Sequence, residues 1–106
     1  MSLIFKRKSV RKFRDEKVSD EKIENLLKAA MQAPSSCNSQ PWEFIVVSDD
    51  EDKLAISKMH KFAKPAAGAS HLIVTLGNLN NAKVIRMIEQ DLGACNENIL
   101  LQATHE

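Results

Sequence analysis

Apolar residues recur every three or four positions between Ser19 and Pro34, which is the spacing of one face of an α-helix. Ser19 is placed to cap this helix, and Asp20 and Glu21 lie in the first turn, where the helix dipole favours carboxylates. Pro34 ends the helix because the residue before a proline is pushed out of the α region. The apolar face consists of Ile23, Leu26, Leu27, Ala30 and Met31.

Two compact runs of β-forming residues, at 44–47 and 71–76, predict two buried strands. Gly77 closes the second run. Between the strands, Asp49 or Asp50 is expected to cap another helix that stops at Pro65. Its apolar residues are Leu54, Ile56, Met59 and Phe62, with Lys58 and Lys61 near its C-terminus.

From about Val84 to Glu106 the pattern is helical again, with two apolar flanks that predict burial against more than one surface. One flank contains Ile88, Leu92, Cys95, Ile99 and Ala103, and the other contains Leu100 and Leu101. Two strands rarely form a stable sheet alone, so a partner chain or residues beyond Glu106 are expected to complete it.

Length and composition predict one cytoplasmic domain. The chain has 106 residues, lacks an apolar run of the roughly 20 residues that span a bilayer, and shows no signal-peptide core. Its two cysteines form no CxxC or metal-ligand spacing. Cys95 lies on an apolar stripe and is expected in the core, as are Met31 and Met59. The net charge of +1 gives no general attraction to nucleic acid.

The charge is nevertheless uneven, because six basic residues crowd the first fifteen positions. They are Lys6, Arg7, Lys8, Arg11, Lys12 and Arg14. Ser2 is a possible cap for one helical turn before them, and Val10 and Phe13 suggest an extended segment with its apolar side packed down. Three interpretations fit the cluster: a solvated face, a weak nucleic-acid patch, or a phosphate-binding segment.

The stretch from Ala33 to Phe44 is a polar loop between the first long helix and the first strand. Its serine, asparagine and glutamine side chains support turns and offer neutral donors and acceptors to a planar polar ligand. Trp42 is an aromatic anchor that packs either beneath the loop or in a subunit contact. Cys37 lies within the loop but has no neighbouring histidine to activate its thiol.

Three motifs in this order resemble the nitroreductase family of flavoproteins. They are Arg7-Lys8-Ser9-Val10-Arg11-Lys12-Phe13, the loop from Ala33 to Phe44, and Gln90-Asp91-Leu92-Gly93-Ala94-Cys95-Asn96-Glu97-Asn98-Ile99-Leu100-Leu101. The resemblance implies an α+β fold, an antiparallel sheet flanked by helices, in an intertwined homodimer that holds FMN at its interface. Residues 1–106 are expected to form a single domain corresponding to the N-terminal portion of the family domain. The resemblance also implies a later Gly-Leu-Gly segment, further strands and a C-terminal basic contact, which do not occur within residues 1–106.

The resemblance also implies which residues bind FMN. The first motif assigns the phosphate and ribityl chain to Arg7, Lys8, Ser9 and Arg11. The second assigns the isoalloxazine ring of the other subunit to Pro34, Ser35, Ser36, Asn38 and Gln40. The third motif has a structural role at the dimer core. No catalytic side chain and no metal ligand is expected, because the flavin carries the chemistry.

The implied activity is ping-pong transfer of electrons from NAD(P)H through FMN to a small acceptor such as a nitroaromatic, a quinone or an activated alkene. No nucleic-acid or membrane partner is expected. The alternative is a truncated, non-catalytic dimeric remnant that binds flavin weakly or not at all. A titration of FMN with an Arg11→Ala control distinguishes these two.

Overall fold

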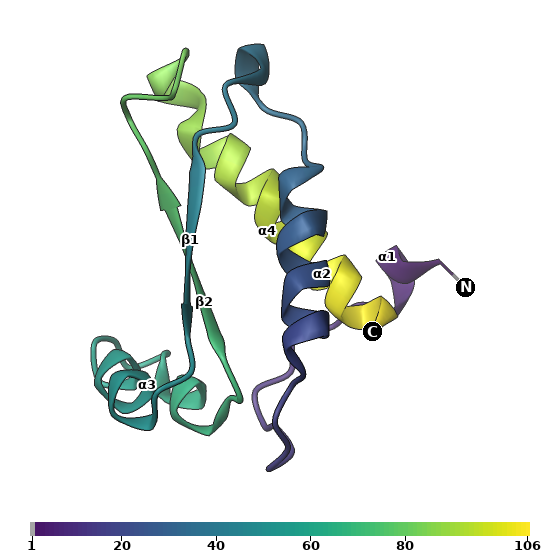
Figure 1. The fold of residues 1–106 in the computed structure, drawn as a ribbon, viewed down its shortest axis with the longest axis vertical. Coiled ribbons are helices and arrows are strands. Elements are labelled where there is room, and N and C mark those ends of the chain that lie inside the picture. Colours follow the sequence, from purple (N-terminus) through teal and green to yellow (C-terminus); the bar gives the residue numbers. More distant parts are fainter. Residues whose placement is uncertain (1) are drawn as a thin grey trace. The chain divides into compact units, whose positions relative to one another are not determined.

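The computed structural model describes residues 2–106, which form four α-helices, two strands and three short 3₁₀ turns (Figure 1). The α-helices are α1 Leu3–Lys6, α2 Asp20–Met31, α3 Asp50–Ser57 and α4 Ile88–His105. The strands are β1 Trp42–Val47 and β2 Leu72–Gly77, and the 3₁₀ turns are η1 Ser36–Asn38, η2 Lys64–Gly68 and η3 Ile85–Met87. This mixture of helices with a small sheet confirms the expected α+β class.

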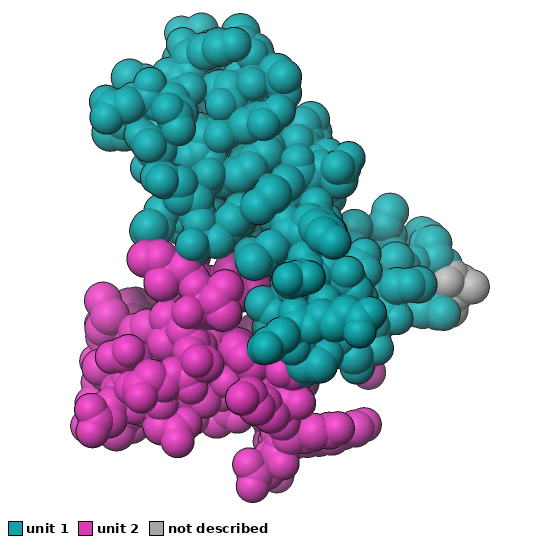
Figure 2. All heavy atoms as spheres, in the orientation of Figure 1, with its two compact units in different colours: residues 1–7, 19–44, 75–106 teal, residues 8–18, 45–74 magenta. Residues whose placement is uncertain are grey.

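The chain divides into two compact units, coloured separately in Figure 2. Among the described residues, the first contains 2–7, 19–44 and 75–106, and therefore α1, α2 and α4. The second contains residues 8–18 and 45–74, and therefore α3. Among residues 2–106, no helix is both long and apolar enough to cross a membrane.

Helix α2 begins and ends where the sequence predicts. The Ser19 hydroxyl accepts a hydrogen bond from the Lys22 backbone N–H at 3.3 Å, which caps the first turn. Asp20 and Glu21 occupy that turn, and the helix ends at Met31, three residues before Pro34. Ile23 and Ala30 are buried, whereas Met31 is half exposed and does not fill the core as expected.

The core of the first unit lies where α2 packs against α4. Ala30 and Cys95 are completely buried there, and Ala33 and Trp42 are buried beside them. The small side chains of Ala30 and Cys95 allow the two helices to approach closely. The Asn98 side-chain amide donates to the backbone carbonyl of Ala29 at 2.9 Å and joins the helices by a polar contact. Cys95 is therefore a core residue, as predicted.

Strands β1 and β2 pair with each other, and their arrows in Figure 1 run in opposite directions. Both predicted strands are confirmed, but the prediction that they are buried is wrong. Ile45 is 51% exposed, and Val46 and Leu76 are also exposed. A two-stranded sheet covers few of its own side chains, so apolar strand residues stay accessible among the described residues.

Helix α3 is shorter than predicted. Asp49 caps it, accepting from the Asp52 N–H at 3.1 Å, and the helix ends at Ser57. The Ser57 hydroxyl bonds back to the Leu54 carbonyl at 2.6 Å, a local contact that competes with continued helix. Met59 therefore lies beyond the helix and is 80% exposed rather than core filler.

The basic segment that follows α1 is irregular, as expected, but its apolar residues are not packed down. Val10 and Phe13 are both exposed, so this part of the prediction is wrong for the chain described. Ser2 precedes α1 at the capping position, yet its side chain makes no capping hydrogen bond. A four-residue helix has one turn only, and it depends on its packing against α4.

Candidate functional site

The loop between α2 and β1 adopts a strained backbone. Cys37 and Asn38 each have φ of 53° and Gln40 has φ of 50°, and none of them is glycine. The left-handed region costs a residue with a side chain on the order of 1–3 kcal/mol. Asparagine tolerates it best, because its short amide bonds to nearby backbone. The loop therefore needs contacts that hold it in this shape.

Hydrogen bonds within the loop supply part of that support. The Gln40 N–H donates to the Ser35 hydroxyl at 3.1 Å, and the Gln40 side-chain amide donates to Asn38 Oδ1 at 2.8 Å. The Ser39 hydroxyl donates to the Ser36 carbonyl. Four of the five predicted loop residues, Ser35, Ser36, Asn38 and Gln40, thus come together in one hydrogen-bonded cluster. Pro34 is exposed beside it.

Two side chains from outside the loop also contact it. Asp91 on α4 accepts from the Ser36 N–H at 2.9 Å and from the Ser36 hydroxyl at 3.3 Å, both through Oδ1. Lys83 Nζ donates to the Cys37 carbonyl at 3.2 Å. Asp91 is only 4% exposed, and its Oδ2 has no hydrogen-bond partner within residues 2–106.

The sequence prediction did not include Asp91, although a signal was present. Asp91 lies three residues after Ile88 and four before Cys95, so it shares the apolar face of α4. An isolated carboxylate on a buried stripe is unusual, because aspartate is almost never fully buried without a partner. That position alone marks it as a residue with a specific contact.

The end of the loop is fixed in the core of the first unit. Pro41 is fully buried, and its carbonyl accepts from the Asn78 N–H at 2.7 Å. Trp42 packs with Ala30 and Cys95 in this core, which agrees with the packing alternative of the sequence analysis; the subunit contact stays a prediction. An open cavity of about 540 Å³ lies at this end of the loop. It is lined by Leu27, Met31, Gln40, Trp42, Glu43 and Phe44.

The predicted basic ligands fall into both units. Arg7 follows α1 in the first unit, and its Nε lies 3.7 Å from Glu97 Oε1 on α4. Lys8, Ser9 and Arg11 belong to the second unit and are all exposed. Within residues 2–106, neither Lys8 nor Arg11 forms an ion pair.

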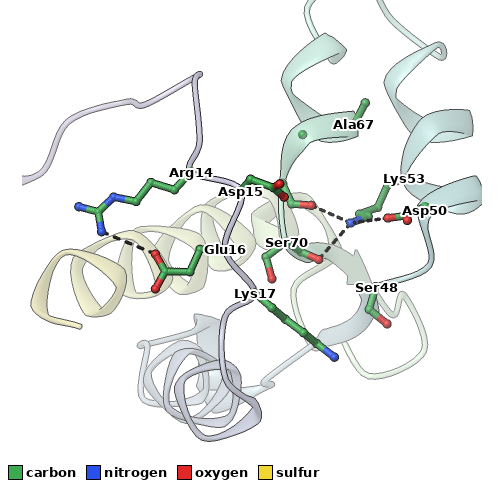
Figure 3. A pocket seen from close by; sticks show the side chains of 11 residues that line it. Arg14, Asp15, Glu16, Lys17, Ser48, Asp50, Lys53, Ala67 and Ser70 are labelled. Carbon is green, nitrogen blue, oxygen red and sulfur yellow. Dashed lines mark hydrogen bonds and ion pairs between the residues drawn. The ribbon is translucent and has the colours of Figure 1, made fainter.

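The second unit contains a separate polar cavity of about 400 Å³ beside a buried lysine (Figure 3). Lys53 Nζ donates to the carbonyls of Ala69 and Ser70 at 2.8 and 3.2 Å, and lies 3.1 Å from Asp50 Oδ1. These contacts use all three ammonium hydrogens, so Lys53 joins α3 to the segment before β2 and has no donor left for a ligand. The sequence held no signal for it, because the residue is one lysine among many.

Comparison with known proteins identifies the family. The family model described as "Nitroreductase family" matches residues 4–88. The chain belongs to the nitroreductase family. Its α+β fold is therefore a nitroreductase-family fold.

Individual relatives of the nitroreductase type match this chain over nearly its whole length. A provisionally named NADH dehydrogenase/NAD(P)H nitroreductase from Archaeoglobus fulgidus is 43% identical over 97% of this chain and 60% of its own length. A solved structure of a provisionally named NADH oxidase from Clostridium acetobutylicum is 47% identical, with a TM-score of 0.94 over 96% of this chain and 61% of that one.

A third relative was solved with a flavin. The provisionally named nitroreductase from Desulfovibrio desulfuricans, in complex with FMN, is 31% identical, with a TM-score of 0.91 over 97% of this chain and 60% of that one. The present chain thus spans about 60% of the length of these relatives.

Proposed function

We propose that this chain is an FMN-dependent NAD(P)H oxidoreductase of the nitroreductase type, acting as a homodimer on small electrophilic acceptors such as nitroaromatics or quinones. The observation that carries the proposal is that the family match at residues 4–88 includes both groups of candidate FMN ligands. The FMN complex of the Desulfovibrio desulfuricans relative supports the choice of cofactor. Residues 1–106 are proposed to act as a single nitroreductase-like domain.

The basic segment fits the phosphate of FMN. That group carries close to two negative charges at neutral pH, and guanidinium groups match it with planar, paired donors. Lys8 and Arg11 are exposed and have no ion pair within residues 2–106, so their charges are available. Arg7 Nε lies 3.7 Å from Glu97 Oε1, a contact between partly exposed side chains that leaves the other guanidinium donors of Arg7 free.

The polar loop fits the edge of the isoalloxazine ring. This edge alternates hydrogen-bond donors and acceptors, and the hydroxyls and amides of Ser35, Ser36, Asn38 and Gln40 offer both kinds within one cluster. We assign the loop to the flavin of the partner subunit, with Pro34 at its edge. The exposed Ile4, Phe5, Met31 and Leu100 of the first unit give apolar surface for a second copy to bury.

When bound, FMN supplies the redox chemistry, accepting a hydride from NAD(P)H and passing electrons to the acceptor in a ping-pong cycle. The chain's own residues bind and orient the flavin. The basic segment holds the phosphate end, and the strained loop presents its polar atoms to the ring. No side chain of residues 2–106 is assigned a proton-transfer role.

A titration of FMN into the purified chain tests this proposal through flavin fluorescence quenching. We expect Arg11→Ala to weaken FMN binding by about tenfold or more, because a hydrogen bond to a charged group contributes on the order of 1.5–3 kcal/mol. Arg14→Ala removes the same charge from the same segment, at a residue that lies 3.6 Å from Glu16 and outside the motif. It should leave the affinity within about twofold.

Turnover gives the second measurement. The FMN-loaded chain should consume NAD(P)H when a nitroaromatic is added, and consumption should fall with Arg11→Ala at limiting FMN. A chain that binds no FMN, or that loses equal affinity in both arginine variants, contradicts the proposal.

A further inference from the structure

The Ser35–Gln40 loop carries more backbone strain than its internal contacts explain. Three residues with positive φ cost on the order of 1–3 kcal/mol each. The hydrogen bonds among Ser35, Asn38 and Gln40 link the loop only to itself. These bonds would persist if the whole loop changed its position, so they do not fix the loop relative to the helices. Something outside the loop has to select this conformation.

Asp91 is the external contact best suited to do so. Its Oδ1 accepts from the Ser36 N–H at 2.9 Å, directly before the strained residues, and a carboxylate bond to a backbone N–H is stronger than a neutral one. Lys83 also touches the loop, but its side chain is exposed and long, and its contact is 3.2 Å. The rigid helix α4 carries Asp91, whereas Lys83 precedes it on irregular chain.

Asp91 lies in the first turn of α4, where the helix dipole favours a carboxylate, but exposed Glu89 in the same turn supplies that charge without being buried. The Asp91 side chain is 4% exposed, and Oδ2 has no partner within residues 2–106, so burial of this group opposes folding. An apolar residue of similar size would serve the packing of α4 better. The contribution that an apolar residue could not replace is the pair of bonds to Ser36.

We propose that Asp91 is a positioning residue, which fixes the Ser35–Gln40 loop in the shape that binds FMN. The inference rests on the proposed function for the ligand. It assigns to a buried carboxylate on α4 an indirect control over flavin affinity, without contact between Asp91 and the flavin.

The test combines backbone hydrogen exchange without flavin and FMN affinity in the same variants. In Asp91→Leu, amides of residues 36–40 should exchange about tenfold faster or more, amides of α2 should be unchanged, and the Kd for FMN should rise about tenfold or more. Asp91→Asn keeps an oxygen acceptor and should restore both values to within about threefold. Glu89→Gln is the control, because Glu89 is exposed in the same turn of α4.

Ser36→Pro removes the donor of the same hydrogen bond, and it replaces Asp91→Leu in the test if that variant does not fold. Ser35 has φ of −145° and ψ of 157°, the extended conformation that precedes a proline, and Ser36 starts the 3₁₀ turn. The substitution removes the N–H donor, so exchange of residues 37–40 should rise as it does in Asp91→Leu.

Unchanged loop exchange in Asp91→Leu or in Ser36→Pro overturns the positioning role. Faster exchange with an unchanged Kd overturns it as well, since the loop shape would then be irrelevant to FMN. A wild-type chain with protected loop amides that binds no FMN contradicts the proposed function instead, and the flavin-free exchange data separate the two failures.

Discussion

The two cysteines of this chain occupy opposite environments. Cys37 is exposed in the strained loop, and Cys95 is completely buried between α2 and α4. Burial raises the pKa of the Cys95 thiol above its ordinary value of 9.0, because the charged thiolate is disfavoured away from water. Accessibility and ionisation therefore both protect Cys95 from thiol reagents, whereas Cys37 is open to attack.

A thiol assay checks this contrast. Ellman's reagent at pH 8 should modify one thiol per native chain rapidly, and Cys37→Ser should abolish that fast phase. The second thiol should react only on unfolding. Two equally fast thiols in the native wild-type chain would contradict the buried position of Cys95.

The raised pKa also predicts the direction of a pH effect in the Cys37→Ser background. Above pH 9.0 the unfolded chain loses the Cys95 proton while the folded chain keeps it, so the folded state binds more protons. The free energy of unfolding should therefore fall as the pH rises above 9.0, as measured by urea denaturation. A Cys95→Ala variant should lack this component.

At the scale of elements, the contact of β2 with α4 rests on a glycine. A Cβ added to Gly77 would lie 2.7 Å from Ile88 Cδ1 and 3.2 Å from Leu92 Cδ1. Gly77 thus lets the end of the strand approach the first turns of the helix. The same helix carries Asp91, so this packing also places the contact to the loop.

Gly77→Ala should lower the free energy of unfolding by about 1 kcal/mol, near the low end for overpacking because the Ile88 side chain can move. Gly68→Ala is the matched control, since no heavy atom lies within 4 Å of its added Cβ. It should leave stability unchanged or raise it by up to about 1 kcal/mol. Equal losses in chemical denaturation of the two variants would contradict the close approach.

The sequence predicts the positions of the helices and strands better than the burial of their side chains. Ser19, Pro34 and Asp49 act through neighbours a few residues away, so local pattern was enough to place α2, β1, β2 and the start of α3. The exposure of Ile45 and Val46 depends on what covers the sheet, and no local rule contains that information. The end of α3 was missed because the Ser57 hydroxyl bonds back to the helix.

The candidate site divides in the same way. The motifs located the basic segment and the polar loop because the side chains of the motif residues are themselves the candidate ligands. Asp91 and Lys53 act over 55 and 16 residues of sequence separation respectively, through single contacts that exist only in the folded chain. Their roles could be inferred only once α4 and α3 were placed beside their targets.

At the scale of the whole molecule, the proposed homodimer accounts for apolar surface on the first unit. Phe5 on α1 is 76% exposed, and α1 packs against α4, the helix that family resemblance puts at the dimer core. Phe62 is equally exposed, at 76%, but lies in the second unit, with the His60 ring 5.3 Å away and Lys61 Nζ over its face.

These two phenylalanines give a matched test of dimerisation. We expect sedimentation equilibrium to find a homodimer, whose dissociation constant rises about tenfold or more in Phe5→Ser, because a buried aromatic side chain contributes on the order of 1.5–3 kcal/mol. Phe62→Ser should change it by less than about threefold. A monomeric wild-type chain, or equal effects of both substitutions, would refute the proposed dimer contact.

The three left-handed residues of the loop also restrict which amino acids can replace them. Valine, isoleucine and threonine have branched Cβ atoms that clash with the backbone at positive φ, so Cys37, Asn38 and Gln40 should reject them whatever the ligand. Glycine relaxes the strain but widens the range of shapes that the free chain samples. Substitutions at these three positions are therefore expected to be confined to small and amide side chains, and larger changes in the chemistry of the loop have to come from its other residues.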